Sequence, residues 1–300
     1  MFRAALAIIF FIAPLAAQQY TPARAEWNQP VEPFKIIGNL YYVGASDVTS
    51  YAIVTPDGII LIDTGFRETV PLIKANIEKL GFHFEDIRYI LTLHAHNDHA
   101  GGVAEIRERT KARFLASPGD APEYERGGQD DFAFGNNFYY PPVKPDALLH
   151  DGEKVSLGGT TLTAVFTPGH TKGSTSWTTT IRDGGREYHV VFVSSLSTPD
   201  YQLVDNPKYP TIVSDLQASF AKLRALPCDI FLSQHGMQFD LTRRIQQRTA
   251  DPSRNPFVDP DGYRRFIDAA EANVRKIVAE QTAAAKPKPK PKAAKAKSTK

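Results

Sequence analysis

The sequence lacks several features that define common protein classes. Among its 300 residues Cys228 is the single cysteine, which excludes an intramolecular disulfide and a cysteine-rich zinc site. It contains no G-x-S-x-G motif, no phosphate-binding P-loop and no dinucleotide-binding glycine motif. Beyond the first 17 residues, no apolar run reaches the ~20 residues that a transmembrane helix needs. Because Cys228 is surrounded by apolar residues, we expect it to pack as a small hydrophobic side chain rather than act as a nucleophile.

The amino terminus has the parts of a secretory signal peptide. Arg3 supplies a positive charge, residues 4–17 form a short apolar stretch, and residues 23–25 offer an A-x-A cleavage site. We therefore expect a signal peptide over residues 1–25 and export to the periplasm. Cleavage after Ala17 and an uncleaved membrane anchor are the alternatives, although the apolar stretch is short for an anchor.

The carboxyl terminus carries most of the excess positive charge. Residues 286–300 hold seven lysines and no acid, whereas the formal net charge of the whole chain is +2, so the rest of the chain is acidic. A segment that alternates lysine with proline and alanine cannot form a core. We expect residues 284–300 to be a disordered, solvated tail; binding to nucleic acid or to an anionic envelope surface is the alternative.

Strand and helix patterns occur twice along the chain. Apolar, β-branched runs separated by turn residues predict strands in the first half at 34–37, 40–43, 51–54, 59–62 and 89–93. Apolar spacing predicts helices there at 68–80 and about 103–110. The second half is predicted to contain strands at 160–166, 174–181, 188–193 and 229–232, and helices at 212–226 and 263–281. The fold class is therefore α/β, a two-half sandwich forming one domain over residues 26–283.

Two loops have compositions that suggest a role near a site. Residues 44–50 form a polar hairpin tip that we expect to overhang the site. Residues 127–145 are rich in glycine and aromatic residues, and a long loop inside a compact domain is often a lid. An ordered surface excursion without a chemical role is the alternative for this second loop.

Histidine and aspartate follow the predicted strand 89–93 at a spacing typical of metal sites. In extended chain His94 and His96 point to the same side, so both can reach one ion. Asp98 and His99 then turn away from the strand and can face a second ion. Imidazole and carboxylate are ligands that suit zinc. The structural alternative, a polar turn with solvated histidines, is disfavoured by the density of the cluster.

Two later histidines complete a possible pair of metal sites, because each follows a predicted strand in a turn-like context. The predicted ligand sets are His94, His96 and His170 for one zinc ion and Asp98, His99 and His235 for a second. Two zinc ions about 3.5–4 Å apart share a water, lower its pKa towards 7 and polarise a carbonyl group. The sequence thus predicts hydrolysis of a carbonyl or phosphoryl compound.

Asp63-Thr64-Gly65, at the end of the predicted strand 59–62, allows another interpretation. An aspartic protease uses this triplet, but its chemistry needs two carboxylates that share a proton. The sequence contains no second copy, and only a dimer would supply one. We therefore expect Asp63 to form a turn or to support a metal ligand.

Taken together, these motifs resemble the metallo-β-lactamase superfamily, and the two ligand sets resemble its subclass B3. The similarity extends over residues 27–281. The motifs that carry it are His94-x-His96-x-Asp98-His99, Asp63-Thr64-Gly65, Asp130-Asp131-x-x-Phe134-Gly135, Tyr140-Pro141-Pro142, Thr167-Pro168-Gly169-His170, Gly173-Ser174-Thr175-Ser176-Trp177, Ser195-Leu196-Ser197-x-Pro199-x-Tyr201-Gln202-Leu203, Asn206-Pro207-x-Tyr209-Pro210, Arg224-Ala225-Leu226-Pro227-Cys228-Asp229 and His235. The resemblance implies a four-layer αβ/βα sandwich with the metals in a groove at the sheet edges.

The resemblance also implies roles for individual residues. A hydroxide that bridges two zinc ions would attack the β-lactam carbonyl of penicillins, cephalosporins and carbapenems. Asp98 and Tyr201 would be catalytic residues: the zinc held by Asp98 stabilises the departing ring nitrogen, and Tyr201 lies near the carbonyl oxygen. Ser195 and Ser197 would bind the substrate carboxylate.

The chain departs from the family pattern at two places. Many superfamily hydrolases carry a Gly-Asp pair whose aspartate bridges the metals, whereas this chain has Ser194-Ser195. This difference argues against thioester hydrolysis of the glyoxalase II type. A disulfide near the carboxyl end of some B3 members is also absent, because Cys228 has no partner.

The sequence thus favours a periplasmic, monomeric di-zinc β-lactamase that acts on small molecules and confers antibiotic resistance. A lactonase or another ester hydrolase on the same scaffold is the alternative enzyme. A phosphodiesterase that acts on nucleic acid has only the basic tail in its favour, so no nucleic-acid partner and no stable membrane anchor is expected. A zinc-storage or structural protein is disfavoured, since structural zinc sites are usually closed four-ligand cages, often with cysteine.

Overall fold

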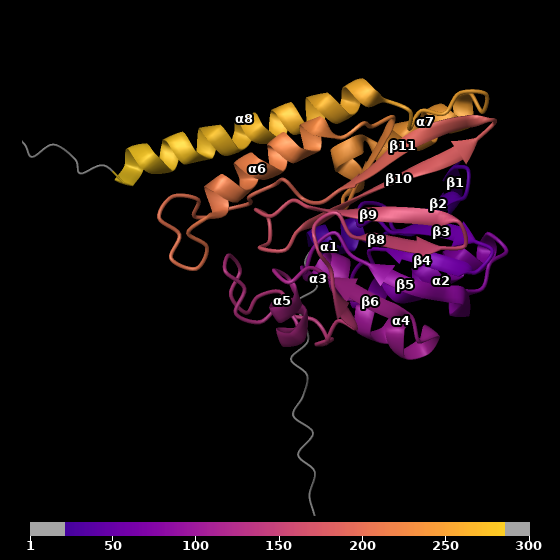
Figure 1. The fold of residues 1–300 in the computed structure, drawn as a ribbon, viewed down its shortest axis with the longest axis horizontal. Coiled ribbons are helices and arrows are strands. Elements are labelled where there is room, and N and C mark those ends of the chain that lie inside the picture. Colours follow the sequence, from indigo (N-terminus) through magenta and orange to yellow (C-terminus); the bar gives the residue numbers. More distant parts are fainter. Residues whose placement is uncertain (1–21, 286–300) are drawn as a thin grey trace, which may run out of the picture.

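In the computed structural model, which describes residues 22–285, two β-sheets pack face to face between two layers of helices (Figure 1). The arrangement confirms the expected αβ/βα sandwich. Most of the predicted signal peptide and residues 286–300 of the predicted tail lie outside the described residues. Within residues 22–285, no helix has both the length and the apolar composition that a membrane span requires.

The larger sheet contains seven strands in chain order. They are β1 Phe34–Ile37, β2 Leu40–Tyr42, β3 Tyr51–Thr55, β4 Gly58–Ile62, β5 Ile87–Leu91, β6 Arg113–Ala116 and β7 Ala147–Leu148. Strands β1 to β4 pair antiparallel, and β4 to β7 pair parallel. The isoleucine and leucine runs of β4 and β5 fit this position, because parallel strands are usually covered on both faces.

The smaller sheet has the order β12-β11-β10-β9-β8. Its strands are β8 Lys154–Leu157, β9 Thr160–Phe166, β10 Thr175–Asp183, β11 Arg186–Val193 and β12 Ile230–Ser233. The predicted hairpin is confirmed: β10 and β11 are joined at Gly184 and Gly185, whose φ angles of +56° and +81° favour glycine. Strand β12 pairs parallel with β11 and ends just before His235.

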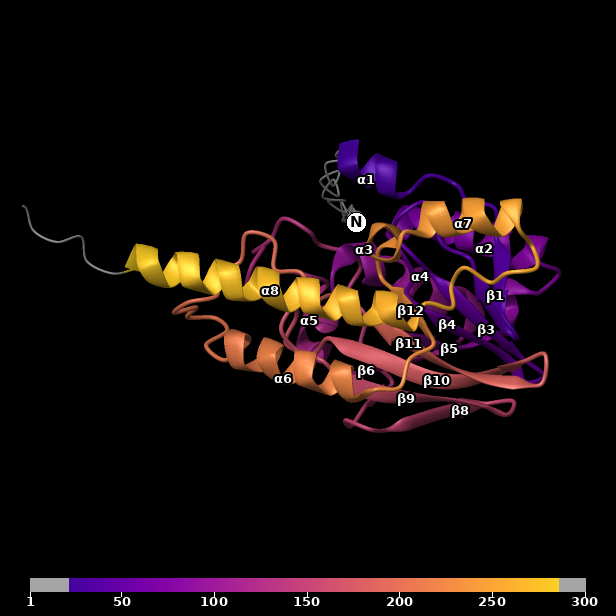
Figure 2. The ribbon, with the colours of Figure 1, turned by 90° about the horizontal axis from the view of Figure 1, so that it is seen from above.

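Helices cover the outer face of each sheet. Those described are α1 Pro22–Trp27, α2 Val70–Lys79, α3 Asn97–Ala100, α4 Val103–Thr110, α5 Ala121–Arg126, α6 Ile212–Ala225, α7 Leu241–Ala250 and α8 Pro260–Ala285. Helices α2 and α4 pack on the larger sheet, and α6 and α8 run side by side over the smaller one (Figure 2).

Two apolar cores hold the layers together. The core between the sheets includes Tyr51, Trp177 and Phe192, each with 0% of its surface exposed. A second core, between the larger sheet and its helices, includes Ile73 and Ile106. Full burial of one such aliphatic side chain contributes about 1.5–3 kcal/mol. The sheets are therefore rigid supports for the loops at their edges.

The sequence analysis did not predict helices α1 and α7 or strands β7 and β8, and it misjudged two segments. Helix α7 was not predicted, because its buried face consists of Leu241 and an arginine, Arg244, rather than an apolar stripe. Helix α8 reaches Ala285, two residues into the predicted tail. Residues 44–50 adjoin the site, but as a largely buried segment that is hydrogen-bonded to the chain around His235 rather than as an open hairpin tip. Cys228 is partly buried against the apolar core that includes the smaller sheet, and burial raises the pKa of its thiol.

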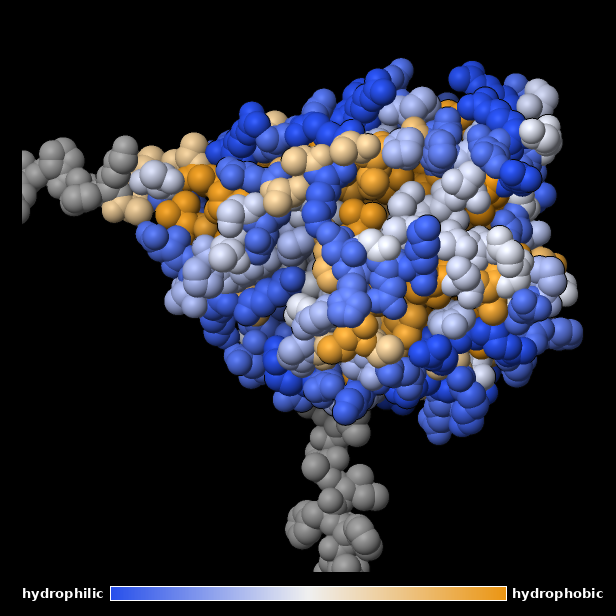
Figure 3. Space-filling model, viewed as in Figure 1, coloured by the Kyte–Doolittle hydropathy of each residue, from blue (hydrophilic) through white to orange (hydrophobic). Residues whose placement is uncertain are grey.

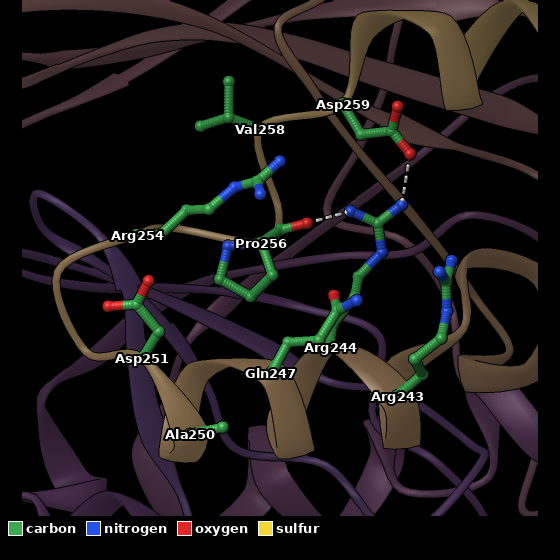
Figure 4. Close-up of a pocket in the computed structure, with 9 residues that line it drawn as sticks. All are labelled: Arg243, Arg244, Gln247, Ala250, Asp251, Arg254, Pro256, Val258 and Asp259. Atoms are coloured by element: carbon green, nitrogen blue, oxygen red, sulfur yellow. Dashed lines mark hydrogen bonds and ion pairs between the residues drawn. The ribbon is translucent and has the colours of Figure 1, made fainter.

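A hollow of about 410 Å³ lies between α7 and the loop that follows it, and the side chains that line it hold the two segments together (Figure 4). Arg244, which is 4% exposed, crosses it and donates hydrogen bonds to the carbonyl oxygens of Phe239 and Pro256 and to the carboxylate of Asp259. Its guanidinium also faces the ring of Phe257. Arg244 therefore ties α7 to the loop that leads into α8.

Replacing Arg244 with methionine should lower the free energy of unfolding by about 2–4 kcal/mol, because three acceptors lose a charged donor in a buried place. For a domain of this size the midpoint Tm should fall by roughly 5–15 °C in a thermal melt. Arg243→Met is the control, since Arg243 pairs with Asp240 at the surface, where ion pairs contribute about 0–1 kcal/mol. Equal, small shifts in both variants would contradict the structural role of Arg244.

Candidate metal centre

The predicted ligands meet at one edge of the sandwich. Residues 94–99 follow β5, Asp63 follows β4, and His235 follows β12, while His170 lies in the loop between β9 and β10. In open α/β sheets the carboxyl ends of parallel strands form the edge where ligands bind. The fold therefore gathers histidines that are up to 141 residues apart in the sequence.

Three histidines form the first cluster, and the structure brings together the set that the sequence predicted. One ligand atom each from His94, His96 and His170 lies within 4.8 Å of the other two. Nδ1 of His96 is 3.0 Å from Nε2 of His170. All three residues are buried, and Nδ1 of His94 has no hydrogen-bond partner among residues 22–285. Converging imidazole nitrogens that are buried and incompletely paired fit a zinc ion.

A carboxylate organises the second cluster. Oδ2 of Asp98 is 3.2 Å from Nε2 of His99 and 3.4 Å from Nε2 of His235. Ligand atoms of Asp98 and His99 also lie within 4.8 Å of His94, so the two clusters adjoin. The donors are one carboxylate and two imidazoles, which is again a set that suits zinc.

Each of four histidines has an oxygen atom behind its ring, although at His96 the distance is too long for a hydrogen bond. Asp63 Oδ2 is 3.1 Å from His99 Nδ1, and Asp131 Oδ2 is 3.6 Å from His96 Nε2. The two remaining acceptors are Asp47 Oδ2, 2.7 Å from His235 Nδ1, and the carbonyl oxygen of Ser197, 2.7 Å from His170 Nδ1. Such outer acceptors fix the tautomer and the ring orientation of metal-binding histidines. The expectation that Asp63 supports a ligand agrees with this geometry.

Asp120 fastens the two ligand loops to each other. The residue is 2% exposed, and its carboxylate accepts hydrogen bonds from the Ala95 amide, the Thr171 hydroxyl and the Gly173 amide at 2.7–3.0 Å. Burial raises the pKa of its carboxyl to about 6, although these donors oppose the shift. At Gly173 the backbones approach so closely that a Cβ would lie 2.1 Å from the Asp120 nitrogen, so the position requires glycine.

The electrostatics favour the ligand forms of three of the six side chains, His94, His170 and Asp98. Burial and neighbouring histidines lower the pKa of His94 and of His170 well below the usual value, so both imidazoles are neutral. Burial opposes ionisation of Asp98, but His99 and His235 outweigh it and hold the pKa of the carboxyl well below its usual range. Metal ligands must be neutral imidazole or ionised carboxylate, which are the forms of His94, His170 and Asp98. At His99 the carboxylates of Asp98 and Asp63 outweigh burial and raise the pKa to about 10, so a metal ion would have to displace a proton from this ring.

The predicted substrate-binding residues lie on the loop between β11 and α6. The hydroxyl oxygens of Ser195 and Ser197 are 2.9 Å apart; Ser195 is buried and Ser197 is exposed. Tyr201 is 2% exposed, and its hydroxyl donates to the carbonyl oxygen of His170 at 3.1 Å. Burial raises the pKa of Tyr201, so its hydroxyl stays protonated.

The loop 127–145 extends the site on one side. Phe134 stacks edge to face on His96 at 5.2 Å between ring centroids and on Phe138 at 5.1 Å. Phe138 is 43% exposed, which is unusual for a large apolar residue. The loop therefore carries aromatic side chains from the first cluster to the surface.

Comparisons with known proteins agree with this site. Residues 43–235 match the family model of the metallo-beta-lactamase superfamily. The native FEZ-1 metallo-beta-lactamase from Legionella gormanii is 43% identical, with 85% of this chain and 98% of that chain covered and a TM-score of 0.83. BJP-1, a subclass B3 metallo-beta-lactamase of Bradyrhizobium japonicum, is 38% identical, with 88% and 100% covered and a TM-score of 0.82.

Curated relatives match over shorter lengths. A hydroxyacylglutathione hydrolase from Rhodopseudomonas palustris is 35% identical over 104 residues, which are 35% of this chain and 32% of that protein. The chain spans about half the length of other curated relatives that it matches. The family model and the B3 structures nevertheless cover most of this chain, including both ligand clusters. The chain therefore belongs to the metallo-beta-lactamase superfamily, and its similar solved structures include subclass B3 enzymes.

Proposed function

We propose that this chain is a zinc-dependent β-lactamase that hydrolyses the cyclic amide of penicillins, cephalosporins and carbapenems and thereby confers resistance to them. The observation that carries the proposal is the convergence of two adjoining clusters of ligand atoms in a chain 38–43% identical to metallo-beta-lactamases. We propose one zinc ion for each cluster, held by His94, His96 and His170 and by Asp98, His99 and His235.

The chemistry divides between the metal and the chain. Bound zinc supplies a water whose pKa is lowered towards 7 and polarises a carbonyl group, as amide hydrolysis requires. Asp63 and Asp47 lie behind His99 and His235, so the opposite ring nitrogens face the site. The carboxylates thereby keep each imidazole in the orientation and tautomer that a ligand needs.

We assign substrate binding to the loop between β11 and α6. The Ser195 and Ser197 hydroxyls are close enough for both to donate to one carboxylate group, which β-lactam antibiotics carry beside the ring. The hydrogen bond from Tyr201 to His170 supports a role in orienting that ligand. The aromatic side chains of Phe134 and Phe138 offer an apolar wall for the antibiotic's side group.

Hydrolysis of a lactone or thioester is the second candidate, because a hydroxyacylglutathione hydrolase matches part of the chain. The residues that stand here in place of the Gly-Asp pair of other superfamily hydrolases argue against thioester hydrolysis. Here Ser194 turns its hydroxyl to the carbonyl oxygen of Leu93, 2.8 Å away, and neither Ser194 nor Ser195 brings a carboxylate. Comparing turnover of a carbapenem, a homoserine lactone and a glutathione thioester separates the candidates.

Removing the metal provides the direct test. The mature protein should hydrolyse a chromogenic cephalosporin, lose at least about 95% of that activity after dialysis against a chelator, and regain it when zinc is added, because its own residues supply no activated nucleophile. Elemental analysis should find close to two zinc ions per active chain. Full activity of the metal-free protein would contradict the proposal.

We also propose that the chain is exported and that processing occurs before Arg24. The Arg24 guanidinium pairs with both carboxylate oxygens of Glu68, at 2.5 and 2.7 Å, and lies over the ring of Phe66. Cleavage after residue 25 would remove these contacts, whereas cleavage after Ala17 retains them. The intact mass of the periplasmic protein should therefore include Arg24; a chain that begins at Glu26 would contradict this placement.

A further inference from the structure

Gln281, near the carboxyl end of α8, makes three hydrogen bonds to the backbone of the loop that carries the proposed substrate-binding residues. Its Oε1 accepts from the amides of Leu203 at 2.7 Å and Val204 at 3.0 Å. Its Nε2 donates to the carbonyl oxygen of Tyr201 at 2.7 Å. The side chain thus uses both ends of its amide on three neighbouring loop residues.

This loop otherwise has little regular structure to fix it. Residues 194–211 contain no helix or strand in the described part of the chain. A hollow of about 410 Å³ lies between the loop and the end of α8, beside Gln281. The end of α8 projects past the sheets (Figure 1), and apolar side chains reach the surface beside it (Figure 3). Tyr201 and Leu203 are buried in the core, and Gln202 and Asn206 hydrogen-bond within the loop, so Gln281 adds a direct link from α8 to a loop that has no helix or strand of its own.

The same loop touches the metal centre at two points. The Ser197 carbonyl oxygen accepts from His170 Nδ1, and the Tyr201 hydroxyl donates to the His170 carbonyl oxygen. The Tyr201 ring also packs against Phe132 and Phe134 of the loop 127–145, at 5.2 and 5.6 Å between centroids. Tyr201 is therefore the junction of both loops with a metal ligand, and Gln281 holds its backbone.

We propose that Gln281 is a positioning residue: it fixes Tyr201 and the loop 194–211 so that His170 and the Ser195–Ser197 hydroxyls keep the geometry used for metal and substrate binding. The role in turnover rests on the proposed β-lactamase function. The role in ordering the loop and His170 does not depend on it. A side chain that served only to anchor α8 would affect thermal stability without affecting substrate or metal affinity.

The test compares Gln281→Ala with Thr282→Ala in the full-length zinc-loaded protein. Thr282 is the matched control, because it is the next residue of α8 and, within residues 22–285, its hydroxyl bonds only to the carbonyl oxygen of Val278 in the same helix. In Gln281→Ala the amides of Leu203 and Val204 should exchange hydrogen at least about 10-fold faster, since they lose their acceptor. The KM for a chromogenic cephalosporin should rise about 5- to 20-fold with kcat changed less than about 3-fold, and the zinc dissociation constant should rise about 3- to 10-fold.

Gln281→Glu keeps the size and the acceptor but loses the donor to Tyr201. Protection of the Leu203 and Val204 amides should survive in this variant, whereas the KM and the zinc dissociation constant should still rise. Unchanged exchange in Gln281→Ala, or equal changes in Thr282→Ala, would overturn the proposal. If the wild type hydrolysed no β-lactam, the proposed function would fail, and exchange together with zinc affinity would still decide the role of Gln281.

Discussion

Replacing Asp98 with alanine is expected to lower the turnover of a chromogenic cephalosporin by more than about 100-fold. Loss of a residue that only supports a metal ligand costs about 10- to 100-fold, and Asp98 is itself a proposed ligand. The carboxylate lies between His99 and His235 and is the anionic member of the second cluster. Without it, the imidazoles of His99 and His235 face each other and the cluster loses its negative charge. We therefore expect the variant to bind close to one zinc ion instead of two.

Two further variants separate the effect of losing the carboxylate charge from a general loss of structure. Asp98→Asn keeps the volume of the side chain but not the charge, and it should lose nearly as much activity as Asp98→Ala. Asp57→Ala is the control, because Asp57 is exposed in the turn between β3 and β4, away from the ligand loops. It should leave turnover within about 2-fold, as surface changes usually do. Near-full activity and full zinc content in Asp98→Ala would contradict the ligand assignment.

Local spacing made the first ligands readable from the sequence. His94, His96, Asp98 and His99 lie within six residues of each other, directly after an apolar strand, so their convergence needs only an extended chain followed by a turn. The strand patterns were equally local, since β4 and β12 are short apolar runs whose side chains are almost all buried. The placement of His170 and His235 depended on resemblance and on their positions after strands.

The supporting acids were not readable in the same way. Asp47 is 188 residues from its partner His235, and it lies in a polar segment that looked like an exposed hairpin tip. Asp120 follows the ordinary turn sequence Ser117-Pro118-Gly119, yet it joins two loops 78 residues apart, around Ala95 and Gly173. Such pairs form where segments that are distant in the sequence meet in the fold. Neither the periodicity nor the spacing of residues along the chain predicts these meetings.

Of these supporting acids, Asp120 should be the most sensitive to an isosteric change. Asparagine has one acceptor oxygen where aspartate has two, and Asp120 uses Oδ2 for Ala95 and Oδ1 for Gly173. In Asp120→Asn one amide would face an NH2 group, which leaves a buried donor without a partner. We expect a loss of about 2–4 kcal/mol in the free energy of unfolding and a 10- to 100-fold weaker affinity for zinc.

Chelator competition and a urea melt would measure the two effects on the same preparation. Asp251→Asn is the control, because Asp251 is likewise a hydrogen-bond acceptor, from the amide and hydroxyl of Ser253, but lies at the exposed end of α7. The distinguishing result is the combination: a loss of stability alone would make Asp120 a general packing residue. A loss of zinc affinity in the folded variant means that the distance between the His94–His96 segment and the His170 loop is set by this carboxylate. Wild-type zinc affinity and stability together would show that the two loops hold their positions without it.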